Sequence, residues 1–303
     1  MEYLHNNRDL FFEAVITAAD AIQLNPKTVE KDYYISIILR MISQYIPFAV
    51  FKGGTSLSKC YQVINRFSED IDITVDSHIT AGQKEAVKTS LARIASETGL
   101  KISNFNSTRS RRDFNRYEFS YNSVFEDLSY RIVSNVLIEV TYTAISFPTI
   151  EMLVHNYIGD MLAANNSAAQ KHYRLEPFTM KIQSLSRTFI DKVFALCDYY
   201  LQKKEENHSR HLYDLYKLEP LMIFDNTFAM LVKEVRTLRS GSPNCPSANQ
   251  SVNIPELLIR IAEEDAYKDD YQRTTIPLFR SDCRDDYDKA KSVLLKIACS
   301  GMF

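Results

Sequence analysis

The first residues suited to chemistry form a glycine turn, Gly53-Gly54-Thr55-Ser56, which follows a short apolar run. Glycine lets the backbone approach a ligand closely, and the free N–H groups of a following helix start suit phosphate oxygens. The spacing is not that of a Walker A loop, which excludes a P-loop. We therefore expect Gly53, Gly54, Thr55 and Ser56 to bind nucleotide phosphates. The alternative is a tight strand-to-helix turn without a ligand.

Two aspartates, Asp70 and Asp72, follow the turn within a run of alternating apolar residues. Side chains two apart on a strand point to the same face, so these carboxylates would repel each other without a cation between them. Mg²⁺ binds one or two carboxylates together with substrate phosphates, and two such ions can clamp the oxygens of a displacement at phosphorus. With the upstream turn, the pair predicts a two-magnesium site for an NTP. An isolated pair would instead favour an exposed polar strand.

A third carboxylate, Glu139, lies in the apolar run Val136-Leu137-Ile138-Glu139-Val140. Burying an unpaired charge is costly, and a metal ion or a cationic partner removes that cost. We therefore predict that Glu139 completes the metal site with Asp70 and Asp72. The alternative is a half-buried strand from which Glu139 faces solvent.

The elements that must position these residues are mixed in the first half of the chain. Asn25 and Pro26 are typical of a helix start, and the alternation of Ile71, Ile73 and Val75 with polar residues is typical of a strand. The pattern predicts helices over 26–45, 55–64 and 80–98 and strands over 48–51, 70–75, 101–106, 114–121 and 133–143.

The pattern changes near residue 150 and then predicts helix almost throughout. We expect helices over 184–204, 211–218, 226–238, 254–266 and 282–298. The predicted fold class is therefore α+β. A mixed-sheet domain flanked by helices would span 1–160, and a mainly helical domain over 161–303 would close the active-site cleft.

Composition narrows the class of protein further. With 303 residues, 45% hydrophobic and 24% charged, the chain is typical of a globular protein of two domains. A net charge of -2 excludes a uniformly basic nucleic-acid binder but not a local basic groove. The five cysteines are scattered, and no apolar run is long enough to span a bilayer. We expect a cytoplasmic protein without a membrane partner.

Three segments resemble the AbiEii/AbiGii nucleotidyltransferase toxin family, which is itself similar to the DNA polymerase beta-like nucleotidyltransferases. They read Lys52-Gly53-Gly54-Thr55-Ser56-Leu57-Ser58-Lys59, Arg66-Phe67-Ser68-Glu69-Asp70-Ile71-Asp72 and Ser209-Arg210-His211-Leu212-Tyr213-Asp214-Leu215-Tyr216. The upstream Val29-Glu30-Lys31-Asp32-Tyr33-Tyr34 also fits the family's N-terminal helix. The resemblance implies a nucleotidyltransferase-like fold for the mixed-sheet domain.

The same resemblance implies two further site residues. Asp191-Lys192-Val193-Phe194-Ala195-Leu196 is similar to a family helix whose lysine, here Lys192, would contact nucleotide phosphates as a point charge. Asp214 matches the aspartate of the family's last motif, where it would orient either Lys192 or the acceptor hydroxyl. The family's usual lysine and aspartate are replaced here by Arg210 and His211, so His211 receives no catalytic role and Arg210 is only a candidate phosphate contact.

The function implied by the resemblance is transfer of NMP from an NTP co-substrate to an acceptor hydroxyl, with Mg²⁺ bound and pyrophosphate leaving. Asp70, Asp72, Glu139, Lys192 and Asp214 would be the catalytic residues. In the characterised branch of the family the acceptor is the 3′ end of tRNA, so the resemblance implies a block of translation, with an antitoxin as the usual partner. The alternatives are a small antibiotic-like acceptor, a protein hydroxyl, or a non-catalytic module that binds NTP or a partner.

An RNA-binding surface is predicted where basic and aromatic residues alternate, because this mixture suits phosphate contact and base stacking. The aromatic residues are Phe105, Phe114 and Tyr117. The predicted RNA contacts are Arg109, Arg111, Arg112 and Arg116. The equally weighted alternative is a solvated β-hairpin.

Overall fold

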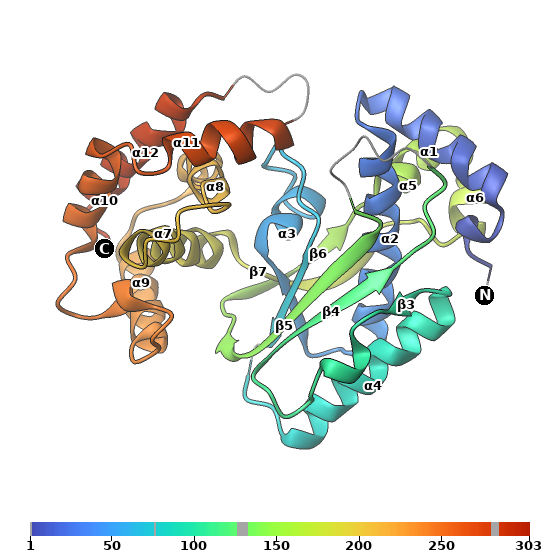
Figure 1. Ribbon diagram of the computed structural model, residues 1–303, viewed down its shortest axis with the longest axis horizontal. Coiled ribbons are helices and arrows are strands. Elements are labelled where there is room, and N and C mark those ends of the chain that lie inside the picture. Colours follow the sequence, from blue (N-terminus) through green and yellow to red (C-terminus); the bar gives the residue numbers. More distant parts are fainter. Residues whose placement is uncertain (1, 76, 126–132, 280–284) are drawn as a thin grey trace. The chain divides into compact units, whose positions relative to one another are not determined.

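The structure is a computed structural model that describes residues 2–75, 77–125, 133–279 and 285–303. It divides into two compact units, each treated by itself below. The first unit comprises Met1–Gln62 and Phe67–Gln183, and the second comprises Val63–Arg66 and Ser184–Phe303. The predicted α+β class is confirmed, because a mixed sheet with helices and a set of helices account for most described residues (Figure 1).

Within the described part of the first unit, seven strands form one sheet in the order β3-β4-β5-β2-β1-β7-β6. β2 lies antiparallel to β1 and parallel to β5, and the β3–β4, β4–β5 and β6–β7 pairs are antiparallel. The strands are β1 (Ala49–Lys52), β2 (Ile71–Val75), β3 (Lys101–Ile102), β4 (Phe114–Ser120), β5 (Asn135–Ile145), β6 (Thr149–Val154) and β7 (Phe178–Gln183).

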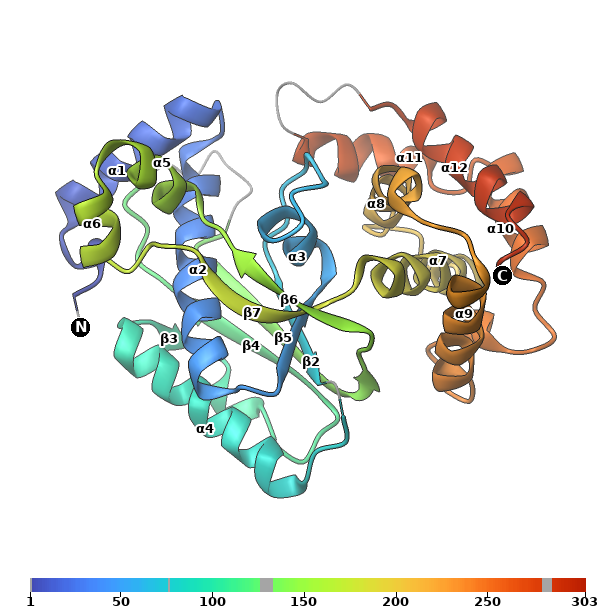
Figure 2. The ribbon, with the colours of Figure 1, turned by 180° about the vertical axis from the view of Figure 1, so that it is seen from behind.

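One face of the sheet is apolar and the other carries charge. Ile73 and Val140 are buried on adjacent strands, whereas the neighbouring Asp72 and Glu139 are only partly buried. This alternation is the period-2 pattern of a sheet with one covered face. Helices α2 (Pro26–Tyr45) and α4 (Ala81–Thr98) cover the apolar face (Figure 2).

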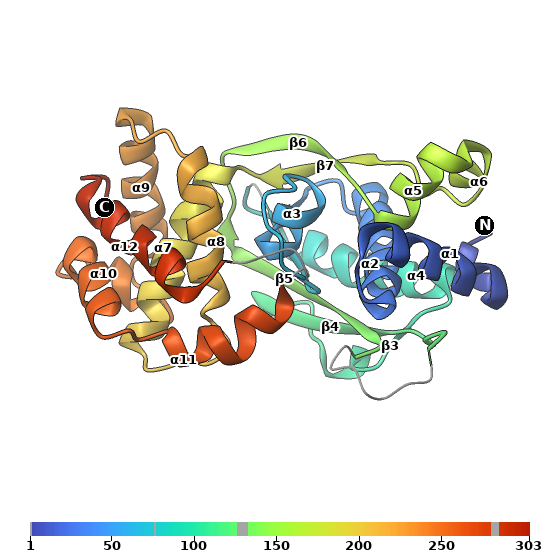
Figure 3. The same ribbon diagram turned by 90° about the horizontal axis from the view of Figure 1, so that it is seen from above.

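Helix α2 begins as the sequence predicts, since the Asn25 side chain accepts a hydrogen bond from the N–H of Lys27 at 2.9 Å. Helix α1 (Arg8–Ile22) was not predicted and packs against α2. Its buried residues, Phe11, Val15, Ala18 and Ala19, have the spacing of one helix face, so the signal was present in the sequence. Helices α5 (Tyr157–Asn165) and α6 (Ser167–His172) lie on the same side as α1 (Figure 3).

The expectation of helix almost throughout after residue 150 is wrong for two segments. β6 pairs with β7 along its length, and Ile182 of β7 pairs with Phe51 of β1. These pairings join segments distant in the chain, and local periodicity does not reveal non-local hydrogen bonding. Because β7 belongs to the sheet, the first unit extends to Gln183. The predicted division into domains at residue 160 stays a prediction.

Several predicted elements are shorter than expected, among them the following three. The strand over 101–106 is limited to β3 and is followed by the 3₁₀ turn Phe105–Ser107. The helix predicted to reach residue 64 is α3 (Gly53–Lys59). The last predicted helix is α12 (Tyr287–Cys299), and residues 282–284 of that prediction lie outside the described residues.

The described part of the second unit is built from helices, in agreement with the sequence pattern. Helix α8 packs against α7 and α12, and α10 packs against α12. The helices are α7 (Leu185–Leu201), α8 (Arg210–Leu218), α9 (Asn226–Arg239), α10 (Ile254–Glu263), α11 (Lys268–Asp270) and α12. Among the residues that the structure describes, no helix has both the length and the apolar character required to cross a membrane.

Candidate active site

A row of charged residues crosses four neighbouring strands of the first unit. Asp72 on β2 is in register with Lys52 on β1 and with Glu139 on β5. Arg116 on β4 is in register with Glu139. Residues paired directly across strands share a face of the sheet. The fold therefore brings two of the predicted carboxylates, Asp72 and Glu139, side by side between two cations.

The glycine turn lies directly against Asp72. Gly53 has a φ of 79°, a left-handed value that side chains other than glycine rarely adopt. A Cβ atom at Gly53 would lie 2.0 Å from Oδ2 of Asp72. Glycine is thus needed here for both its backbone conformation and the space that the carboxylate occupies.

The hydroxyls of Thr55 and Ser56 are buried and take part in hydrogen bonds inside the protein. Thr55 Oγ1 donates to the carbonyl of Asp70 at 2.6 Å and lies 2.9 Å from Oγ of Ser68. Ser56 Oγ donates to the carbonyl of Gly53 at 2.8 Å. These bonds shape the turn and join it to the segment before β2. A phosphate-binding role for Thr55 and Ser56 stays a prediction.

The donor chemistry on this face suits a hard cation. Asp72 lies on β2, and Asp70 precedes this strand. Carboxylate oxygens are the ligands that Mg²⁺ prefers, and Mg²⁺ commonly takes its other ligands from substrate phosphates and water. Glu139 is held by Arg116: Oε1 accepts a hydrogen bond from Nε at 3.0 Å and forms an ion pair with Nη2 at 2.8 Å. In the described ranges no group of three or more His, Cys, Asp or Glu side chains is arranged to hold a metal ion. The metal role of Glu139 stays a prediction.

The second unit contains a buried cluster of three charges. Asp214 on α8 accepts from Lys192 on α7, with Nζ 2.6 Å from Oδ2. It also accepts two hydrogen bonds from Arg66, from Nε to Oδ1 at 2.7 Å and from Nη2 to Oδ2 at 2.6 Å. Side-chain exposure is 0% for Asp214, 2% for Arg66 and 7% for Lys192. Two cations therefore enclose one anion.

These contacts determine the charge state of the cluster. Burial by itself would raise the pKa of Asp214, but Arg66 and Lys192 reverse that effect and hold the pKa well below its usual range. Burial lowers the pKa of Lys192, and the nearby Arg66 adds to this effect, while Asp214 opposes it. Asp214 is thus ionised at neutral pH, and the three side chains carry one excess positive charge when Lys192 is protonated.

The sequence left two roles open for Asp214, and in the structure its carboxylate holds Lys192. It also holds Arg66, which sequence reasoning quoted only as part of a motif. The signal was the position of this arginine at the start of Arg66-Phe67-Ser68-Glu69-Asp70. Nothing in the sequence connected it with Asp214, 148 positions away.

His211 is an aromatic neighbour of the cluster, close to Lys192 and Arg210. Its ring stacks with that of Tyr199 at a centroid distance of 5.7 Å, and Tyr199 also stacks on His208 at 3.4 Å. Burial lowers the pKa of His211 well below its ordinary value, and Lys192 and Arg210 add to this effect. His211 is therefore neutral at pH 7.

The predicted RNA contacts Arg109, Arg111, Arg112 and Arg116 are all exposed. The side chain of Asn115 fixes the start of their loop by donating to the carbonyl of Arg109 at 3.0 Å. Phe114 is 50% exposed beside them. Of the aromatic residues predicted beside them, Tyr117 is buried in the core and Phe105 is partly buried, so the expectation of three base-stacking rings is wrong for Tyr117. RNA binding by the exposed arginines stays a prediction.

The mixed sheet, its carboxylates beside a glycine turn and the helical unit are consistent with an α+β nucleotidyltransferase fold. The family model described as nucleotidyl transferase AbiEii toxin, type IV TA system, matches residues 37–293. The chain belongs to this family and is a nucleotidyltransferase toxin of a toxin–antitoxin system. No curated protein matches the chain.

Proposed function

We propose that this protein transfers NMP from an NTP to an RNA hydroxyl, at the 3′ end of tRNA, and so blocks translation. The observation that carries the proposal is the contact between Gly53 and Asp72 in the first unit. A carboxylate packed against a turn that tolerates no Cβ is suited to bring a cation and a triphosphate together. Family membership supports the reaction class.

Asp70 and Asp72 would hold Mg²⁺, with Glu139 as the predicted third ligand. When bound, Mg²⁺ would neutralise phosphate charge and lower the cost of charge development on the leaving pyrophosphate. The acceptor oxygen forms a bond to the α-phosphorus, the bond between that phosphorus and the β-phosphate oxygen breaks, and the hydroxyl proton is released. Asp70 and Asp72 are suited to hold the reacting groups in line.

Lys192 and Arg66 would attract the triphosphate, because their charges exceed the single charge of Asp214. A buried excess charge is stabilised by a counterion of opposite sign, and a triphosphate is such an anion. Asp214 would position both cations rather than touch the substrate.

The acceptor is proposed to be RNA because of the exposed arginines at 109, 111, 112 and 116. Arginine pairs with phosphates, and exposed aromatic rings such as Phe114 stack on unpaired bases. The family also implies an antitoxin partner, which we propose for this chain together with a cytoplasmic location.

The proposal is tested by incubating the purified protein with Mg²⁺, total RNA and each labelled NTP in turn, followed by a denaturing gel. We expect one labelled band of tRNA size, which identifies nucleotide and acceptor together. Asp72→Ala is the control and should give no band. A label that appears on protein, or on small molecules after RNA is omitted, would overturn the RNA acceptor, and incorporation by Asp72→Ala would overturn the site.

A further inference from the structure

Three consecutive charged residues of α2 are almost completely buried in the first unit. Glu30, Lys31 and Asp32 are 1%, 2% and 6% exposed, respectively. Charged groups are buried only where partners offset the loss of hydration. Each of the three has such partners, and each reaches a different segment of the chain. The role of Glu30, Lys31 and Asp32 depends on which segments they contact.

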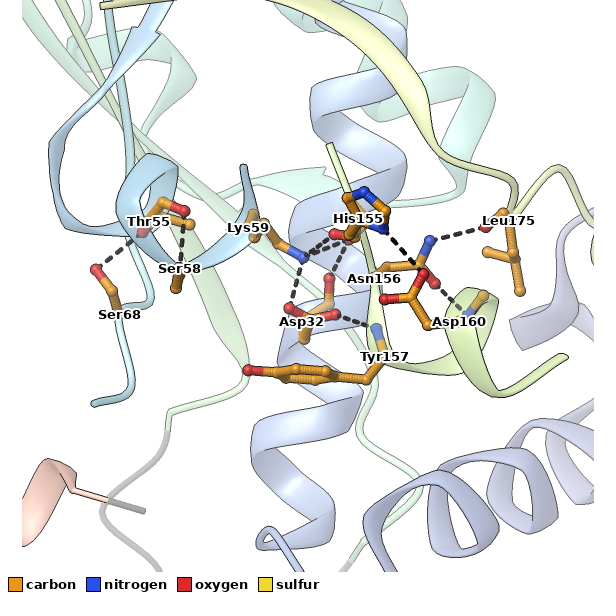
Figure 4. A network of polar contacts seen from close by, with 12 residues as sticks. Asp32, Thr55, Ser58, Lys59, Ser68, His155, Asn156, Tyr157, Asp160 and Leu175 are labelled. Atoms are coloured by element: carbon orange, nitrogen blue, oxygen red, sulfur yellow. Dashed lines mark hydrogen bonds and ion pairs between the residues drawn. The ribbon is translucent and has the colours of Figure 1, made fainter. Parts of the chain in front are cut away.

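Asp32 holds the end of α3, the helix that begins with the glycine turn (Figure 4). Lys59, the last residue of α3, places Nζ 2.5 Å from Oδ1 of Asp32. It also donates to Oγ of Ser36 at 2.7 Å and to the carbonyl of His155 at 3.1 Å. The other oxygen of Asp32 accepts from the N–H of Tyr157 at 3.1 Å. The lysine thus has three partners, and α3 is fastened to α2.

Lys31 holds the residue next to Asp70. Its Nζ forms an ion pair with Oε2 of Glu69, which directly precedes Asp70, and donates to the carbonyl of Val133 at 3.3 Å. The Lys31 side chain is 3% exposed and that of Glu69 is 43% exposed. A buried cation therefore anchors a partly exposed carboxylate at the entrance to β2.

The two anchored segments are also joined to each other. Thr55 Oγ1 donates to the carbonyl of Asp70, and Gly53 packs against the carboxylate of Asp72. A shift of either segment would therefore change the distance between the turn and the aspartates. Glu30, by contrast, binds Oγ of Ser123 and the N–H of Val124, at 2.7 and 2.8 Å, outside both segments.

We infer that Lys31 and Asp32 are positioning residues for the candidate active site. Lys31 acts through Glu69 on the aspartates, and Asp32 acts through Lys59 on the glycine turn. The inference rests on the proposed function, because it gives the two segments a catalytic purpose. A displacement of about 1 Å at a reacting centre can reduce a rate roughly a hundredfold, so two buried contacts can control kcat without touching substrate.

The test compares Lys31→Met, the double variant Asp32→Asn with Lys59→Met, and the matched control Glu30→Gln. The double variant removes both members of a buried pair, which avoids leaving one charge alone. Hydrogen–deuterium exchange is measured on peptides covering 53–59 and 67–72, well below the unfolding temperature of each variant. Transfer is measured as kcat and as KM for the NTP, and Lys31→Arg is the conservative rescue.

We expect Lys31→Met to raise the rate of hydrogen–deuterium exchange at least threefold in the peptide 67–72. The double variant should raise that rate at least threefold in the peptide 53–59. Each should lower kcat at least tenfold with KM changed less than threefold, and Lys31→Arg should recover most of kcat. Glu30→Gln should leave both peptides and kcat unchanged. Unchanged exchange in 53–59 and 67–72, or wild-type kcat in both variants, would overturn the inference. A wild-type protein that transfers nothing would instead refute the proposed function, and the exchange data would still decide whether the segments are held this way.

Discussion

In the first unit, Asp72 and Glu139 lie on a partly buried sheet face, where the side chain of Glu139 is 27% exposed. In the second unit, Asp214 is fully enclosed between Arg66 and Lys192. The Glu139 carboxylate is partly exposed and paired with Arg116 on the sheet, whereas the Asp214 carboxylate is paired with two buried cations. From this difference in burial and partners we predict different roles for two aspartates of the family motifs. Asp72 would serve the substrate, and Asp214 would serve the architecture of its unit.

The variant Asp72→Ala tests the proposed difference between the two units most directly. We expect transfer to fall more than about a hundredfold, because a metal ion contributes several kcal/mol to stabilising charge in the transition state. Stability should hold, because removing one of two neighbouring carboxylates relieves repulsion. Labelled-nucleotide incorporation and thermal unfolding give the two readings. A variant that loses stability and activity together would show that Asp72 is structural.

Asp214→Asn should have the largest effect on stability. The substitution leaves Arg66 and Lys192 buried without their anion, and breaking a buried pair costs roughly 3–5 kcal/mol. Urea unfolding measures the loss. The matched control is Asp265→Asn, which removes solvent-accessible pairs with Lys291 and Lys268 in the same unit and should cost far less, because water screens such pairs. Equal losses in the two variants would contradict the assigned architectural role.

A comparison of Gly53→Ala with Gly99→Ala tests whether the glycine turn of the first unit acts through its contact with Asp72. Both glycines have positive φ, 79° and 70°, so each alanine carries a backbone cost of about 1–2 kcal/mol. Only at Gly53 would the new Cβ collide with Asp72, since nothing lies within 4 Å at Gly99. We expect Gly53→Ala to lose more stability than Gly99→Ala, and Gly53→Ala alone to lose transfer, at least tenfold. Similar activities would remove the link between turn and carboxylate.

Acid should weaken the second unit through its buried histidines. The pKa of His211 is lowered well below its ordinary 6.5, so below about pH 6.5 the unfolded chain binds a proton that the folded chain does not. The contribution of His211 to the free energy of unfolding is therefore complete above about pH 6.5. It is lost as the pH falls below that value, by no more than about 1.4 kcal/mol per pH unit. His211→Gln should flatten the slope between pH 7 and 5 in urea unfolding. A His211→Gln variant with the same slope as the wild-type protein would contradict the assignment of this pH dependence to His211.

Asp214 titrates in a lower pH window, because its pKa is depressed. Its contribution is complete above about pH 3.9, the unfolded value, and is lost as the pH falls further. The two windows allow the histidine and the aspartate to be separated in one pH series.

The smallest effect is expected for Arg116→Ala. The side chains of Arg116 and Glu139 are 51% and 27% exposed, respectively. Such ion pairs contribute less than about 1 kcal/mol to the free energy of unfolding. Stability should hardly change, while tRNA binding should show a salt slope shallower by about one if Arg116 contacts phosphate. Fluorescence titration of tRNA at several salt concentrations measures the slope. An unchanged slope would place the RNA surface elsewhere.

Local sequence predicted a large part of this chain. The helix after Asn25, the strand with Asp72 and the helices after Ser184 follow from caps and periodicity, which depend on neighbouring residues. The glycine turn and the Asp70/Asp72 pair were named from residue types alone. The strands β6 and β7 were missed because their pairing is non-local.

What the sequence by itself determined is therefore the set of chemical groups and their local elements: two aspartates on a strand after a glycine turn, and a lysine on a later helix. Tertiary structure alone decided their partners. It placed Glu139 beside Asp72, enclosed Asp214 between Lys192 and Arg66, and fastened both segments of the candidate site to α2. The physical reason is that strand register and buried ion pairs join residues far apart in the chain, and no local pattern encodes which distant charge will offset the cost of burial.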